Sequence, residues 1–336
     1  MLNENVRGEW LPFGLYGQLE SFLIKNGLRW EGAPERCAVV KDEERIYASA
    51  AIDANVIKYV AVDAGFRQTG WAAMLVSMLI EDAYMRGRTH LFLFTKSENA
   101  ASFSGMGFSE ISEYMGVSLL ECGMGDVKSF ARKLEKHAVP GVNGAIVMNA
   151  NPFTLGHRYL IETAANKVDR LHVFMVREEK SVFPFESRYG ILRKAVSDLE
   201  NVVVHKGGEY ILSHVTFPSY FMKASGEHSA WQAGLDVELF RKHIAPSVHA
   251  AVRFAGDEPF DPATGAYNEK MLEILPAHGI RVEILPRFEI GGEAVSASRV
   301  REYLKKGETE KAYALLPEAT KEFLETDEGK KIIGRL

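Results

Sequence analysis

Cysteine is scarce in this chain of 336 residues, which holds only Cys37 and Cys122. Two cysteines are too few for a disulfide framework or a cysteine-rich zinc site. Long apolar runs are missing too, because the longest strongly apolar stretch, "WAAMLVSMLI", has ten residues, and a helix needs about 20 to cross a bilayer. The N-terminal stretch "MLNENVRGEW" contains acids and no apolar core, unlike a secretory signal. We therefore expect a cytoplasmic protein that does not bind a membrane.

A strong excess of either charge is also absent. The formal net charge is −5, which gives no global attraction to nucleic acid, so phosphate groups would have to be bound through local geometry. Hydrophobic residues make up 46% and charged residues 25%, as in ordinary soluble proteins. Because a domain usually takes about 100–200 residues, the length indicates two domains.

The first half mixes helices with closely spaced strands. Strands 36–40, 45–53 and 56–63 follow one another at short intervals and are expected to pair antiparallel. We expect an α+β domain over residues 1–125 and a connection over 126–142, where an amphipathic segment is broken by Pro140 and Gly141. The other expected elements of this half are helices 13–28 and 71–85, a short helix within 98–108, and strands 89–95 and 114–121.

The second half alternates strand and helix. This pattern predicts an α/β domain over residues 143–336, with a Rossmann-like parallel sheet covered on both faces. The expected strands are 144–150, 171–176, 201–207, 247–256 and 281–287, and the first two helices are 156–168 and 186–199.

The stretch "NANPFTLGHRYLIETAA" joins the first of these strands to its helix. Ligands of parallel sheets bind beyond the carboxyl ends of the strands, which is where Asn149 lies. Pro152 stops the strand, Gly156 allows a close backbone approach, and His157 falls in the first turn of a helix whose free amides and dipole suit phosphate. The alternative is that His157 is a surface residue and Thr154 merely an N-cap.

A second stretch, "GGEAVSASRVREYL", has glycines and serines before a late helix. Ser298 and Arg301 are three residues apart, so the hydroxyl and the guanidinium lie on neighbouring turns of one helix face. The planar guanidinium suits terminal phosphates. Ser296 or Ser298 is otherwise just a helix cap. Taken together, the two stretches predict one nucleotide held from two sides.

"TLGH" followed late by "SASRVR" resembles the HxGH nucleotidylyltransferase superfamily, although Thr154 stands where the first histidine is usual. Four longer stretches, "GAIVMNANPFTLGHRYLIETAA", "SVFPFESRYGILRKAV", "GGEYILSHVTFPSYFMK" and "GDEPFDPATGAYNEKML", resemble the citrate lyase ligase family. The resemblance implies an AMP-forming acid–thiol ligase. Such an enzyme uses ATP and acetate to acetylate the phosphoribosyl-dephospho-CoA-type arm of the citrate lyase acyl carrier protein, with Mg²⁺ carried on the nucleotide phosphates.

The resemblance also implies roles for residues. His157 would donate to the α-phosphoryl oxygens, Thr154 and the backbone of 155–158 would cradle phosphates, and Arg301 would bind the departing diphosphate. Further nucleotide-binding candidates are Asn149, Asn151, Pro152, Phe153, Gly156, Ser296 and Ser298. Additional cations are Arg188 and Lys223, for which a surface or structural role is the alternative, and Lys180. The histidines lack metal-ligand spacing, so no protein metal site is expected.

In the first half, "VDAGFRQTGWAAML" resembles the pyrophosphate loop of GCN5-related N-acetyltransferases, and "ENAASFSGMGF" resembles their later helix. This implies an arm-binding loop formed by Arg67, Gln68, Thr69, Gly70, Trp71 and Ala72. Phe103 stands where those enzymes often carry an acid tyrosine, and it has no proton to give. The alternative for the loop is a glycine turn before a core helix.

Three other functions stay open on the sequence. The chain could transfer adenylyl groups to a nucleotide or to pantetheine phosphate, acetylate amines through its first half, or bind nucleotides without catalysis. Acetate-dependent release of pyrophosphate separates the ligase from all three.

Overall fold

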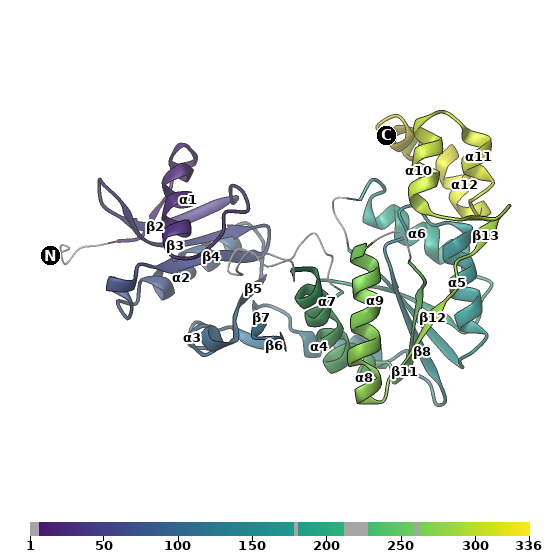
Figure 1. Cartoon of the computed structure of the whole chain (residues 1–336), viewed down its shortest axis with the longest axis horizontal. Coiled ribbons are helices and arrows are strands. Elements are labelled where there is room, and N and C mark those ends of the chain that lie inside the picture. The colour runs from purple at the N-terminus through teal and green to yellow at the C-terminus, as the bar shows by residue number, and fades with distance from the viewer. Residues whose placement is uncertain (1–6, 178–180, 212–227, 259–261) are drawn as a thin grey trace. The chain divides into compact units, whose positions relative to one another are not determined.

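The computed structural model describes residues 7–177, 181–211, 228–258 and 262–336. The chain forms two compact units (Figure 1). The described residues of Met1–Phe130 and Phe217–Glu238 make unit 1, and those of Ala131–Thr216 and Leu239–Leu336 make unit 2. The sequence pattern suggested domains that are continuous along the chain, whereas a segment of the second half packs in unit 1.

Unit 1 is built on a sheet whose described strands run in the order β1-β2-β3-β4-β5-β7-β6. As predicted, β2 pairs antiparallel with β3 and β3 with β4. In chain order the elements of this part are β1 (Glu9–Trp10), η1 (Phe13–Leu15), α1 (Tyr16–Lys25), β2 (Arg36–Lys41), β3 (Ile46–Asp53), β4 (Val56–Val62), η2 (Ala64–Phe66), α2 (Trp71–Met85), β5 (His90–Lys96), η3 (Ser97–Asn99), α3 (Ala100–Ser104), β6 (Ser109–Tyr114), β7 (Val117–Gly123) and α7 (His228–Leu239). Helix α4 (Val127–Glu135) contains the boundary between the two units, which falls after Phe130.

Helix α2 has the bounds that the sequence predicted and packs on the central strands β2, β3 and β4. Its residues Leu75, Val76 and Leu79 are fully buried and form part of the main core cluster of unit 1. Phe103 is buried in the same cluster, with its ring edge-on to Phe108. The helix is therefore a rigid support for the exposed loop that precedes it.

The end of the sheet differs from the expected single strand 114–121. Two strands, β6 and β7, form an antiparallel hairpin that turns at Met115 and Gly116, both with positive φ. Ser112 of β6 is buried because its hydroxyl donates to the carbonyl of Leu235 in α7 at 3.1 Å. Tyr114 lies so close to Gly234 that a Cβ there would come within 2.1 Å of its ring. These contacts explain why α7 belongs to unit 1.

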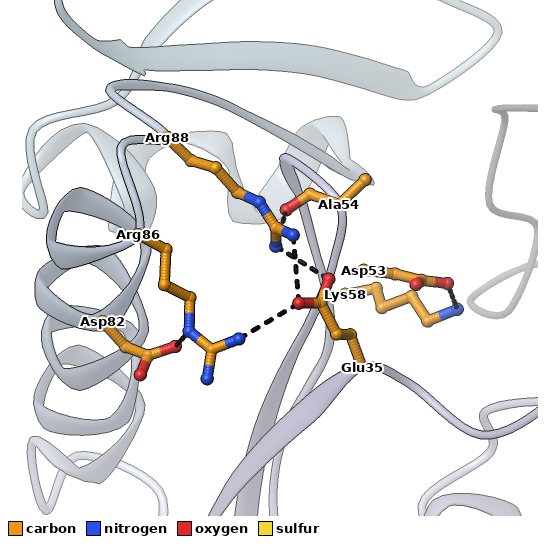
Figure 2. Close-up of polar contacts among 7 residues, drawn as sticks. All are labelled: Glu35, Asp53, Ala54, Lys58, Asp82, Arg86 and Arg88. Carbon is orange, nitrogen blue, oxygen red and sulfur yellow. Dashed lines mark hydrogen bonds and ion pairs between the residues drawn. The ribbon is translucent and has the colours of Figure 1, made fainter. Parts of the chain in front are cut away.

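A network of charged side chains fixes the other end of α2 (Figure 2). Arg88 donates to both carboxylate oxygens of Glu35, at 2.7 and 3.0 Å, and to the carbonyl of Ala54 at 2.8 Å. Arg86 joins Glu35 to Asp82 of α2, at 3.2 and 2.9 Å. The hydrogen bond from Arg88 lowers the pKa of Glu35. Because cations suit a helix C-terminus, the network anchors α2 to the start of β2 and to the β3–β4 turn.

Unit 2 has an all-parallel sheet whose described strands run in the order β10-β9-β8-β11-β12, which confirms the predicted α/β class. Its elements are β8 (Asn143–Met148), α5 (Leu155–Ala165), β9 (Arg170–Met175), α6 (Phe185–Ala195), β10 (Val202–Lys206), η4 (Phe240–Ile244), α8 (Ala245–Ser247), β11 (Ala250–Gly256), α9 (Pro262–Ile274), η5 (Pro276–His278), β12 (Arg281–Leu285), β13 (Glu289–Ile290), β14 (Glu293–Ala294), α10 (Ala297–Lys305), α11 (Thr309–Tyr313), α12 (Glu318–Glu325) and α13 (Asp327–Ile333).

The strand order of unit 2 reverses direction at β8. The chain runs outward from β8 through β9 to β10, then returns to place β11 on the other side of β8. In open parallel sheets the ligand crevice lies at this reversal, beyond the carboxyl ends of the strands. The loop after β8 therefore occupies the expected binding position of the domain.

The last helices of the chain are drawn in yellow-green to yellow in Figure 1. Their buried apolar side chains form a second core together with Phe183. Their apolar residues include Val300 of α10, Leu315 after α11 and Leu324 of α12. Two hydrogen bonds join this core to the loop after β8: Leu155 N–H donates to Leu315 O at 2.9 Å, and the Thr320 hydroxyl donates to Phe153 O at 2.8 Å. The C-terminal helices thus hold the start of α5 in place.

Within the described ranges, none of the helices has both the length and the apolar character that spanning a membrane would require.

Candidate active site

The loop between β8 and α5 is tightly held. Ala150 has a left-handed φ of 48°, and Phe153 is fully buried. Thr154 is the N-cap of α5, and its side chain accepts from the amide of His157. The backbone turn and the cap place His157 in the first turn of the helix, at the carboxyl edge of the sheet, as predicted.

His157 and Thr154 make three contacts with each other. The Thr154 amide donates to His157 Nδ1 at 3.0 Å, Thr154 Oγ1 lies 2.8 Å from the same nitrogen, and the His157 amide donates to Oγ1 at 3.4 Å. Burial, and secondly the charge of Arg287, lower the pKa of His157 to about 4. The imidazole is therefore neutral at pH 7. Its Nε2 carries the proton, since Nδ1 is an acceptor.

The late serine-rich stretch reaches the same place. Ser296 caps α10 by accepting from the Arg299 amide at 3.2 Å. Arg301 donates to Ser298 Oγ at 3.2 Å and also to the carbonyl of Asn151, in the loop after β8. The half-buried Arg301 guanidinium thus joins the two predicted motifs. Arg299, by contrast, is held by Ala294 O, Glu293 and Tyr303.

Gly156 has a packing reason that the sequence did not reveal. A Cβ at this position would lie 3.0 Å from the carbonyl oxygen of Val295, just before the Ser296 cap. The absence of a side chain lets the starts of α5 and α10 approach each other. Gly156 is therefore needed for this close contact.

The first turn of α5 offers fewer free amides than expected. The amide of Leu155 donates to Leu315 O, that of His157 to Thr154 Oγ1, and that of Arg158 to Thr154 O. Among the described residues, none accepts a hydrogen bond from the Gly156 amide. The expected cradle from the backbone of 155–158 is thus reduced to one N–H. Thr154 is only 1% exposed, with its polar atoms turned to His157.

Arg188 has a structural role here, one of the two alternatives that the sequence left open. It is fully buried and donates to Asn149 O and Oδ1 at 2.6 Å and to Val176 O at 3.2 Å. Its Nε also donates to Phe183 O at 2.9 Å. Arg188 therefore ties together the ends of β8 and β9. Asn149 itself is exposed at the carboxyl edge.

Asn151 and Pro152 shape the same loop. Asn151 Oδ1 accepts from the Phe183 amide at 3.0 Å, and Pro152 is buried behind it. The expected cations Lys180 and Lys223 lie outside the described residues. The structure thus brings Asn149, Asn151, Thr154, Gly156, His157, Ser296, Ser298 and Arg301 to one edge of unit 2.

Arg287 is a site residue that the sequence analysis did not identify. It follows β12, donates to Asp257 O at 3.0 Å and pairs with Glu258, and its charge acts on His157. The neighbouring Phe288 ring stacks on Tyr159 of α5 at 5.2 Å. The sequence contained a signal for this position: Asp257 directly follows β11 and Arg287 lies two residues after β12, where ligand-facing polar residues are expected.

The predicted loop of unit 1 is exposed at the start of α2. Gln68 and Gly70 have φ angles of 73° and 80°, and Gly70 is the N-cap of α2 without a side-chain cap. Thr69 Oγ1 donates to Phe66 O at 2.8 Å, and the Trp71 ring stacks on Phe66 at 5.2 Å. Arg67 is exposed, and Ala72 is half-buried in the first turn. Helix-start amides in such a loop suit a phosphate or diphosphate.

Two histidines of unit 2 form a buried pair away from this edge. His172 Nδ1 and His205 Nε2 are 2.9 Å apart, and Asn143 Oδ1 is 3.4 Å from His172 Nε2. Burial lowers the pKa of His172 to about 4 and that of His205 to about 3. Over the part of the chain that the structure describes, no group of three or more histidine, cysteine or acidic residues is arranged to hold a metal.

Comparison with known proteins gives consistent matches over nearly the whole chain. Residues 143–324 match the family described as "Citrate lyase ligase C-terminal domain". The chain is 38% identical over 312 residues to the [citrate [pro-3S]-lyase] ligase of Klebsiella pneumoniae, covering 91% of each protein. It is also 38% identical over 315 residues to the protein of that name from Escherichia coli K12, covering 92% of this chain and 90% of that one.

Solved structures that resemble part of the chain include acetyltransferases. One is a GNAT-family acetyltransferase from Staphylococcus aureus Mu50, with 12% identity and a TM-score of 0.30, covering 36% of this chain and 99% of that one. Another is the ribosomal-protein-S18-alanine N-acetyltransferase of Escherichia coli, with 16% identity and a TM-score of 0.30, covering 35% and 95%.

Proposed function

Because this chain belongs to the citrate lyase ligase family, we propose that it uses ATP and acetate to acetylate the thiol arm of the citrate lyase acyl carrier protein. A thiol cannot usefully attack a carboxylate, because the leaving group would be oxide. Activation by ATP solves this problem. An acetate oxygen attacks the α-phosphorus in line, the bond to the β-phosphate oxygen breaks, and diphosphate leaves. Acetyl-adenylate and diphosphate are the products of this first half-reaction.

The second half-reaction transfers the acetyl group. The thiol sulfur attacks the acetyl carbonyl carbon, the carbon–oxygen bond to AMP breaks, and AMP leaves with that electron pair. The thiol proton passes to solvent. The net reaction yields a thioester, AMP and diphosphate from acetate, ATP and a thiol. Positioning and charge stabilisation are the tasks left to the protein.

The observation that carries this proposal is the contact of Arg301 with the carbonyl of Asn151. Ser298 and Arg301 of α10 therefore lie beside the start of α5, which supports the proposal that the two helix starts bind one triphosphate from both sides. His157 Nε2–H is then the donor for the α-phosphoryl oxygens, and Arg301, Ser298 and the Gly156 amide serve the β- and γ-phosphates. Mg²⁺ is expected to arrive on the nucleotide phosphates.

For unit 1 we propose binding of the thiol-bearing arm, which carries a diphosphate. The loop 67–72 supports this role, because its exposed backbone leads into the uncapped start of α2. Phe103 argues against transfer of an acetyl group from a thioester to an amine in unit 1. In that reaction a thiolate leaves, and a buried phenyl ring cannot protonate it. The nucleophile in the proposed reaction is the thiol itself, so that proton is not required.

The test measures release of pyrophosphate from ATP with and without acetate, and with and without the holo acyl carrier protein. We expect release to require acetate, and acetyl thioester to form only when the carrier is present. Release that is independent of acetate, but stimulated by a nucleotide or by pantetheine phosphate, would identify an adenylyltransferase instead. Acetylation of amines from acetyl-CoA at enzymatic rates would point to the acetyltransferase alternative.

A further inference from the structure

We propose that Thr154 is a positioning residue that holds His157 in the Nε2–H tautomer, so that the imidazole meets ATP as a neutral hydrogen-bond donor. This inference rests on the proposed function, because it concerns the same phosphate site. It assigns Thr154 a role different from phosphate binding, and it gives a reason for threonine at the first position of the motif.

The hydrogen atoms around His157 Nδ1 can be assigned from the contacts. The Thr154 amide has one proton and directs it at Nδ1, 3.0 Å away. Thr154 Oγ1 accepts the His157 amide at 3.4 Å, which leaves its own proton for Nδ1, at 2.8 Å. Two donors therefore converge on the single in-plane lone pair of Nδ1. A proton on Nδ1 would face both donors, so neutral imidazole with Nε2–H is the form that fits.

The surroundings of the ring reinforce this arrangement. The buried Phe153 ring stacks on the imidazole at 5.6 Å with an interplanar angle of 24°, which fixes the ring plane. Arg287 is the charged group that acts on His157, and its positive charge opposes protonation. The low pKa of His157, about 4, has burial as its main cause and agrees with the hydrogen-bond assignment.

Thr154 is poorly placed to bind the substrate itself. Its residue exposure is 1%, so a phosphate oxygen cannot reach the hydroxyl without opening the cap. The Nε2 atom of the imidazole, by contrast, makes no hydrogen bond with the described residues. The half-buried ring is thus held from one side and left available on the other.

A neutral donor has a consequence for how charge is balanced at the site. A triphosphate attracts protons to nearby bases, and an unrestrained histidine would become charged on binding it. Two donors at Nδ1 prevent this, so the positive charge at the phosphates comes from Arg301. His157 then contributes a directed hydrogen bond whose strength does not change between pH 6 and 8.

The tautomer is measured by NMR on the full chain labelled with ¹⁵N-histidine, using His157→Gln to assign the signals. We expect the wild-type ring to show a protonated Nε2 and an acceptor Nδ1, without titration above pH 5. Thr154→Ser retains the hydroxyl and should behave in the same way. Thr154→Val keeps the shape and loses the hydroxyl, so Nδ1 should shift and the titration should move to higher pH.

Kinetics then separate positioning from phosphate binding. In Thr154→Val we expect kcat for acetate-dependent pyrophosphate release to fall about 10–100-fold, because a misplacement of about 1 Å can cost about 10²-fold in rate, while KM for ATP changes less than twofold. Thr154→Ser should retain near wild-type kcat. A raised KM for ATP with unchanged kcat would mean that Thr154 binds phosphate, and our proposal would be wrong.

The two proposals fail in different ways. The NMR measurement needs no substrate, so an unchanged tautomer and titration in Thr154→Val overturns the positioning role whatever the reaction is. If the wild-type protein releases no pyrophosphate in response to acetate, the proposed function fails, and the NMR result still decides the role of Thr154. Thr154→Ser keeps the proposal testable if Thr154→Val does not fold. A folded serine variant with a changed tautomer would also contradict the proposal.

Discussion

At the scale of single residues, His157 is the side chain on which the proposed chemistry depends most. His157→Ala removes the donor to the α-phosphoryl oxygens, and we expect kcat to fall about 10²–10³-fold. The loss of the contacts with Thr154 should lower the free energy of unfolding by about 1 kcal/mol. His278→Ala is a suitable control, because His278 precedes β12 and so lies at the opposite edge of the sheet. A decrease of less than tenfold in folded His157→Ala would exclude the role.

The buried pair of histidines predicts how stability depends on pH. The pKa of His205 falls from 6.5 to about 3 on folding, so the unfolded chain binds more protons between these values. The free energy of unfolding should therefore decrease as the pH is lowered from about 6.5, with His172 and His157 contributing in the same direction. His205→Gln removes one of these groups, and urea unfolding at pH 7 and pH 5 should show a smaller difference than in wild type. An equal difference would contradict the assignment.

Sequence patterns predicted which residues lie together at the candidate site better than they predicted the contacts of those residues. The predicted meeting of residues near His157 with Arg301 follows from where strands and helix starts fall in a parallel sheet. The partner of Arg301, the carbonyl of Asn151, lies 150 residues away and depends on the packing of α10. The sequence left the role of Arg188 open because its partners are carbonyls at the ends of two different strands, which no local pattern reveals.

At the scale of elements, the starts of α5 and α10 must approach closely. Gly156→Ala would place a Cβ 3.0 Å from Val295 O. This distance is too short for an ordinary contact, so the starts of α5 and α10 would have to move apart. We expect KM for ATP to rise about tenfold, equivalent to about 1.4 kcal/mol. Gly190→Ala in α6 is the matched control, because its Cβ would meet nothing within 4 Å. That change should stabilise the protein by up to about 1 kcal/mol and leave KM unchanged. Equal KM values in the two variants would count against the close contact.

The start of α2 gives a second prediction at this scale. Gly70 has a φ of 80°, so Gly70→Ala is strained and should distort the loop 67–72. We expect KM for the carrier thiol to rise, while acetate-dependent pyrophosphate release without the carrier stays unchanged. Gly87→Ala carries the same strain, at a φ of 78°, just beyond the other end of α2. If both variants change KM for the carrier equally, the loop does not bind the arm.

Element boundaries show where sequence patterns succeed and fail. Helix α2 was predicted with its observed bounds, because a glycine loop precedes a continuous apolar helical pattern. Strand β6 was missed, because "SEISEY" contains two glutamates and two serines and lies at the edge of the sheet. Its buried Ser112 is satisfied by a carbonyl of α7, a partner that no local pattern reveals.

At the scale of the whole molecule, the family resemblance found in the sequence is confirmed by the relatives of the chain. The assignment of α7 to unit 1 was not foreseen, because hydrophobic periodicity shows that a helix buries a face without showing which sheet covers it. Deleting residues 1–125, the simplest test of unit 1, would leave α7 without Tyr114 and Ser112. Point variants are therefore the better test.

Gly234→Ala tests this packing directly. A Cβ at Gly234 would lie 2.1–2.5 Å from ring atoms of Tyr114, which cannot be tolerated without movement. We expect a loss of about 1–3 kcal/mol in the free energy of unfolding, as for other overpacked cores. Tyr114→Ala should restore part of this loss in the double variant, which a double-mutant cycle by urea unfolding measures. Additive effects would show that the two residues do not touch.

The discontinuity of unit 1 also sets an order of events during synthesis. Domains generally fold from the N-terminus as they leave the ribosome, yet the β6–β7 hairpin lacks its covering helix until translation has passed Glu238. By that point β8, β9 and β10 have already been made. Unit 1 begins to fold first but is completed only after much of unit 2 has been synthesised. Splitting the protein into two chains at any point between residues 130 and 217 would therefore place the β6–β7 hairpin and α7 on different chains.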